Sequence, residues 1–97
     1  MTLAEEVIEA LRGKVFPKDI QVREVPIFPE FGPGIYAMTE GPGKHDAGFS
    51  KYDVPEGQVY ATISTIGIMS GSVSTYQFSK DTSGKLSLIG RIRNICC

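Results

Sequence analysis

The chain has 97 residues, of which 41% are hydrophobic and 22% charged, and its net charge at neutral pH is −1. These values are typical of a single globular domain over residues 1–97, because one hydrophobic core normally serves about 50 to 200 residues. A nearly neutral chain has no general attraction to nucleic acid or anionic membranes, and no run of about 20 apolar residues is present to span a bilayer. We therefore expect no nucleic-acid partner and no membrane partner.

The two ends of the sequence indicate a cytoplasmic protein. The N-terminal stretch MTLAEEVIEALRGK carries three glutamates and lacks the apolar centre of a secretory signal. The two cysteines, Cys96 and Cys97, are adjacent at the C-terminal end, where a disulfide would close no stabilising loop. Two free thiols are the expected state.

The first predicted element is a helix over residues 3–12. Thr2 and Glu5 have the spacing of a capping box, in which each side chain satisfies a backbone N–H of the other residue. Apolar residues recur at helical spacing on one face, and Gly13 follows as a C-terminal cap. Such a short helix is not stable alone, so its apolar stripe must pack on another element.

The rest of the chain is predicted to form strands and turns. A strand is expected over 19–28, at an edge or with a bulge because Pro26 has no N–H to donate to a neighbour. Further strands are expected over 34–39 and 58–70, the second with a change of phase near Gly67.

Two final strands, 72–79 and 85–94, are predicted to form a hairpin across the turn KDTSG. The preferred register sets Phe78 opposite Leu86, Tyr76 opposite Leu88 and Ser72 opposite Ile92. The opposite face is then mostly polar and is expected to contact solvent. It carries Val73, Thr75, Gln77, Ser87, Ile89, Arg91 and Arg93.

These elements predict an α+β fold with two layers, in which an N-terminal helix packs on a mostly antiparallel sheet of four to five strands. Two stretches, 28–34 and 40–57, show no periodic pattern. The second is long for a compact domain, and such loops are often functional.

The stretch EGPGKHDAG within 40–57 is the part of the sequence that most resembles a site. It fails as a phosphate-binding P-loop, because Met38 stands where the first glycine is required and His45 where the hydroxyl is required. One histidine with a distant cysteine pair does not supply a zinc site, so no metal and no cofactor are expected. The simplest interpretation of His45 is a solvent-exposed loop residue, and the glycines are interpreted as giving the loop freedom of movement.

Aromatic residues beside the two irregular stretches favour a contact surface, because aromatic anchors are common in protein interfaces. The leading hypothesis is a small non-catalytic protein-binding domain, of the inhibitor, immunity or adaptor type, that presents aromatic residues on Gly/Pro loops. The expected partner-binding residues are Phe28, Phe31, Phe49 and Tyr52.

Two other hypotheses remain open. One is a small-molecule-binding protein or small enzyme that uses the 40–57 loop, with Tyr36, Lys44, His45 and Asp46 as its polar groups. It predicts a concave pocket beneath that loop and a His45 pKa displaced from the usual value. The other is a homo-oligomer formed through an edge strand, either the strand containing Pro26 or the C-terminal one.

Overall fold

A computed structural model describes residues 2–27, 33–47, 50–64 and 73–94. Its N-terminal helix, α1 (Leu3–Leu11), is capped as predicted: the Thr2 side chain accepts the Glu5 N–H, and the Glu5 carboxylate accepts the Thr2 N–H. Gly13 follows the helix with a φ of +79°, a conformation that favours glycine. In the described residues, no helix is long and apolar enough to cross a membrane.

The prediction of a strand over 19–28 is wrong. Val22–Glu24 forms a single 3-10 turn, η1, and Glu24 accepts a hydrogen bond from the Gln21 N–H. Side-chain hydrogen bonds of this kind compete with strand pairing for the backbone groups. The only pairing of this segment among the described residues is one isolated parallel bridge, between Ile27 and Ile35. Ile20, Val22 and Val25 of this segment instead pack on the core, with Val25 buried.

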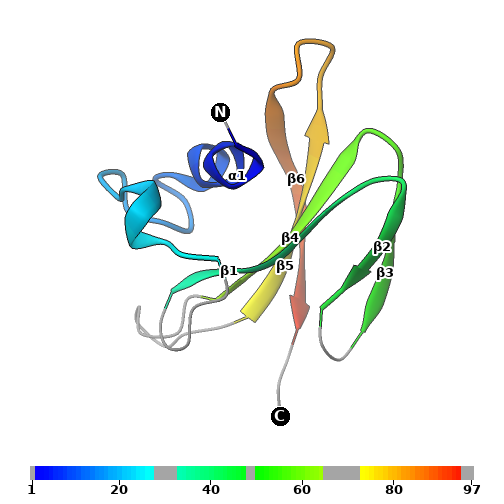
Figure 1. Ribbon diagram of the computed structural model, residues 1–97, viewed down its shortest axis with the longest axis horizontal. Helices are drawn as coiled ribbons and strands as arrows, with labels where there is room; N and C mark the ends of the chain where they lie inside the picture. Colours follow the sequence, from blue (N-terminus) through cyan, green and yellow to red (C-terminus); the bar gives the residue numbers. More distant parts are fainter. Residues whose placement is uncertain (1, 28–32, 48–49, 65–72, 95–97) are drawn as a thin grey trace.

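The main sheet has four antiparallel strands, and the last three are neighbours in the sheet in the same order as in the chain (Figure 1). Its order is β1 (Gly34–Glu40), β4 (Gln58–Ser64), β5 (Val73–Lys80) and β6 (Leu86–Asn94). These strands confirm the predictions at 34–39, 72–79 and 85–94 and the first half of the prediction at 58–70. The change of phase near Gly67 falls outside the described residues.

The hydrophobic core lies between α1 and one face of this sheet. Val7, Ile8 and Leu11 of the helix are fully buried, together with Phe78 of β5. Val59, Ala61 and Ile63 supply the β4 contribution, as expected for alternate residues of one strand. The α+β class with a helix on an antiparallel sheet is therefore confirmed.

The hairpin β5–β6 forms, but the predicted register is wrong. Phe78 lies opposite Leu88 rather than Leu86. The turn determines this pairing: the Asp81 carboxylate accepts the N–H groups of Ser83 and Lys85, and the Asp81 N–H donates to the Lys85 carbonyl. Because the turn closes between Asp81 and Lys85, Lys80 lies opposite Leu86. Phe78 therefore pairs two residues further along β6 than predicted.

A bulge at Ile89 shifts the register further. Gln77 pairs with Gly90 and Phe78 with Leu88, which leaves Ile89 without an opposite residue. Beyond the bulge Tyr76 faces Arg91 rather than Leu88, which places Arg91 on the α1 side of the sheet. Ser72 lies outside the described residues, and Ile92 pairs with Thr75.

The stretch expected to be an irregular loop forms a second, two-stranded sheet. β2 (Gly43–Asp46) and β3 (Lys51–Val54) pair as an antiparallel hairpin. Figure 1 shows this hairpin on the opposite side of the main sheet from α1. It covers part of the face that was expected to contact solvent, where Thr62 and Thr75 are now buried.

Candidate functional site

The β2–β3 hairpin has one inward and one outward face. His45 lies opposite Tyr52 in the pairing, and their rings stack with centroids 6.5 Å apart. Val54 is buried on the same side, whereas Lys44 and Asp53 form an ion pair on the outer side. This alternation is what period-two strands produce when one face is covered.

His45 is fully buried, so the expectation of a solvent-exposed loop residue is wrong. Its Nδ1 lies 3.2 Å from the Thr39 hydroxyl, and its Nε2 is hydrogen-bonded to the Thr62 hydroxyl. Thr62 is in turn 3.1 Å from the Thr75 hydroxyl. The imidazole therefore joins β2 to three strands of the main sheet through threonine side chains. We call these four residues the His45 cluster.

Burial lowers the pKa of His45, because an apolar environment penalises the imidazolium, while the nearby Asp46 carboxylate opposes this effect. Tyr60 contacts the ring edge-on, with centroids 6.4 Å apart. A neutral imidazole suits the cluster, since one ring nitrogen then donates and the other accepts. Because the side chain has no exposed surface, this arrangement fits a role in holding the hairpin on the sheet better than proton transfer to a substrate.

The four residues of the expected ligand site do not converge. Lys44 and Asp46 are exposed on the outer face of the hairpin, whereas His45 points inward. Tyr36 is half-buried in β1, at a bulge where no residue of β4 lies opposite it. Among the described residues, no group of three or more His, Cys, Asp or Glu side chains is placed to hold a metal ion.

Only one of the expected partner-binding residues can be placed. Tyr52 is half-buried in β3, where its ring stacks on His45. Phe28, Phe31 and Phe49 lie outside the described residues, as do Cys96 and Cys97. The role of these aromatic residues in binding stays a prediction.

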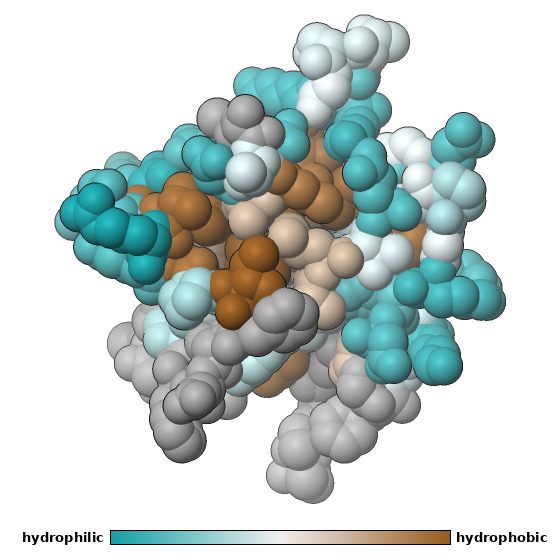
Figure 2. Space-filling view, viewed as in Figure 1, coloured by the Kyte–Doolittle hydropathy of each residue, from teal (hydrophilic) through white to brown (hydrophobic). Residues whose placement is uncertain are grey.

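Three apolar or aromatic residues lie on β1 or are bridged to it. Ile27 is 42% exposed and is joined to this strand by its bridge to Ile35. Tyr36 and Met38 are both half-buried in this strand, and Met38 packs against the hydrophobic core. On the side of the molecule drawn in Figure 2, apolar side chains gather near the centre and polar side chains surround them. We call Ile27, Tyr36 and Met38 the β1 surface.

The position of Ile27 was not predicted, because residues 19–28 were expected to form an edge or bulged strand, whereas only Ile27 is bridged to β1. The exposed fraction of this side chain depends on how the segment after α1 returns to the sheet, and that is not a local property of the sequence. Comparisons of the chain with protein-family models, with curated proteins and with solved structures gave no match.

Proposed function

We propose that the protein is a non-catalytic protein-binding domain of the inhibitor, immunity or adaptor type, and that it holds its partner at the β1 surface. The observation that carries the proposal is the exposed Ile27 at the edge of the main sheet. Apolar residues within a polar rim are typical of interface centres. A cytoplasmic location stays a prediction.

Two further features support this surface. The bulge in β1 leaves Tyr36 outside the regular pairing with β4, and bulges commonly redirect a side chain beside a functional site. In the sequence, Phe28 follows Ile27 directly and Phe31 is close behind, so the expected aromatic contacts belong to the same stretch of chain. Catalysis at His45 has less support, because the side chain is fully buried.

The test compares two exposed isoleucines. Ile27→Asp alters the β1 surface, and Ile89→Asp is the matched control, since Ile89 is 53% exposed on β6 at the other edge of the sheet. Each variant and the wild-type protein are used for affinity purification from native cells, followed by quantitative mass spectrometry. Direct binding to the purified partner is then measured.

We expect one partner to bind the wild-type protein and Ile89→Asp, and to bind Ile27→Asp at least about tenfold more weakly, since central anchors typically contribute more than 1 kcal/mol. Circular dichroism verifies that each variant is folded. Equal affinity for Ile27→Asp and the wild-type protein would reject the β1 surface. Phe31→Ala is expected to weaken the same complex.

A further inference from the structure

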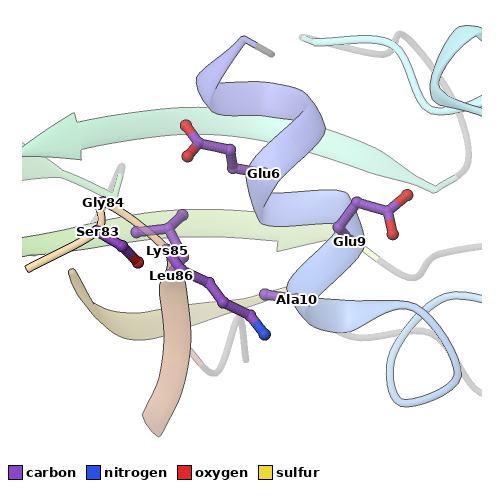
Figure 3. Close-up of a pocket in the computed structure, with 7 residues that line it drawn as sticks. All are labelled: Glu6, Glu9, Ala10, Ser83, Gly84, Lys85 and Leu86. Carbon is purple, nitrogen blue, oxygen red and sulfur yellow. The ribbon is translucent and has the colours of Figure 1, made fainter. Parts of the chain in front are cut away.

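A groove separates α1 from the turn of the β5–β6 hairpin (Figure 3). Its volume is about 520 Å³, within the range of small-molecule sites. Glu6, Glu9 and Ala10 line it from the helix, and residues 83–86 line it from the hairpin. Neither the β1 surface nor the His45 cluster contributes a residue to it.

The two ends of the groove carry opposite charges. Figure 3 shows the Glu6 carboxylate at one end and the Lys85 side chain extending toward the other. Within the described residues, neither Glu6 nor Lys85 has an ion-pair partner within 4.0 Å. These two charges are thus available to a ligand that spans the groove.

The other charges nearby are largely compensated. The Glu9 carboxylate is paired with Arg12 at 2.7 Å, and Figure 3 shows it directed away from the hairpin turn. Lys80 of β5, whose pKa is raised mainly by its hydrogen bond to Glu40 and slightly by Glu6, is paired with Glu40. Among the described residues, Glu6 is thus an anion and Lys85 a cation without an ion-pair partner, while the Asp81 carboxylate, which accepts the Lys85 N–H, adds a negative charge at the turn.

Two residues that line the groove are apolar. Ala10 lines it from α1, beside the Lys85 side chain in Figure 3, and Leu86, which is 5% exposed, contributes from the first position of β6. The Ser83 hydroxyl is bound to the Asp81 carboxylate at 2.6 Å, so it is already engaged. An apolar centre between opposite charges is complementary to a molecule with the same three-part order.

We propose that this groove binds a zwitterion whose ammonium and carboxylate groups are separated by an apolar linker, as in an ω-amino acid or a short apolar peptide with free termini. The ammonium group lies at Glu6 and the carboxylate at Lys85, with the linker on Ala10 and Leu86. Charge complementarity selects both the class of ligand and its direction in the groove.

The test follows backbone amide signals of the isotope-labelled protein by NMR during titration with trialanine and, separately, with 6-aminohexanoate. We expect saturable shifts at Glu6, Ala10 and residues 83–86. Acetylated and amidated trialanine, hexylamine and hexanoate each lack at least one of the required charges and are expected to bind at least about tenfold more weakly, which corresponds to 1.4 kcal/mol. A response to trialanine alone identifies the peptide, and a response to 6-aminohexanoate alone identifies the ω-amino acid.

Two variants test the charges separately. Glu6→Gln and Lys85→Gln are each expected to weaken binding of the responding zwitterion about tenfold. The matched controls are Glu56→Gln and Lys51→Gln, which change exposed residues outside the groove. Unchanged affinity in the two groove variants, equal binding of hexylamine, or the absence of saturable shifts with both zwitterions would overturn the proposal.

Discussion

The imidazole of His45 makes the stability of the fold depend on pH. Burial lowers its pKa, so the folded protein binds fewer protons at this site than the unfolded chain does. The contribution of His45 to the free energy of unfolding is therefore complete above the unfolded pKa of about 6.5. It is lost as the pH falls from there through the folded pKa, and the total loss is about 1.4 kcal/mol for each unit by which folding lowers the pKa. We expect urea denaturation to show this loss on acidification below neutrality.

His45 is the only histidine, which makes a single substitution a clean control. His45→Gln retains hydrogen-bonding groups but does not titrate, so its free energy of unfolding is expected to be lower at neutral pH and nearly constant down to the range where carboxylates titrate. A wild-type protein with the same flat profile would show that the imidazole carries no such linkage.

At the scale of the element, Gly41 allows the residues just before β2 to lie close to the residues just after β3. A Cβ at this position would lie 1.8 Å from the Pro55 carbonyl oxygen, and the Gly41 N–H donates to the Gln58 carbonyl at 2.9 Å. The interpretation of this glycine as a source of loop mobility is therefore wrong: it permits close packing. We expect Gly41→Ala to lower the free energy of unfolding by about 1–3 kcal/mol in urea denaturation, because backbone must move.

Gly43→Ala is the matched control within the same segment. A Cβ at Gly43 would lie 3.5 Å from the Thr39 methyl group, an ordinary contact, and its φ is not positive. The free energy of unfolding of Gly43→Ala is expected to stay within about 0.5 kcal/mol of the wild-type value or to rise slightly, since alanine restricts the unfolded chain. Equal losses in the two variants would contradict the role of Gly41.

At the scale of the whole molecule, both edges of the main sheet are interrupted. Tyr36 in β1 and Ile89 in β6 each lack an opposite residue, and bulges at edges disfavour pairing with another chain. We expect light scattering in reducing buffer to give the mass of one chain, 10.5 kDa, at all concentrations tested. Deletion of Ile89 makes β6 more regular, and this variant is expected to show a higher average mass. A stable wild-type dimer would favour edge-strand association instead.

The elements that the sequence predicted correctly have strong local patterns. The capping box and the 3.6-residue period define α1, and apolar alternation defines β4 and β5. The segment 19–28 has similar apolar spacing, but the contact between Gln21 and Glu24 turns the backbone locally. At the bulge the adjacent apolar residues Leu88 and Ile89, followed by Gly90, interrupt the alternation, but this break does not by itself say which residues of β5 they face.

The site residues were harder to predict because their environment comes from distant segments. Lys44 and Asp46 flank His45, so β2 shows no apolar alternation that would indicate a buried side. The Thr62 hydroxyl that bonds His45, and the Thr75 hydroxyl that bonds Thr62 in turn, lie on a face that looks polar in the sequence. Glu6 and Lys85 line the same groove only because the hairpin turn lies beside α1.

The contacts of His45 with two tyrosine rings give the hairpin a spectroscopic signal. The chain contains no tryptophan, so its near-ultraviolet circular dichroism arises mainly from tyrosine and phenylalanine. Tyr52 stacks on the imidazole and Tyr60 contacts it edge-on, and rings immobilised in this way produce dichroism that disappears when packing is lost. Detachment of the hairpin alone would therefore reduce the near-ultraviolet spectrum while the far-ultraviolet spectrum of α1 and the main sheet persists.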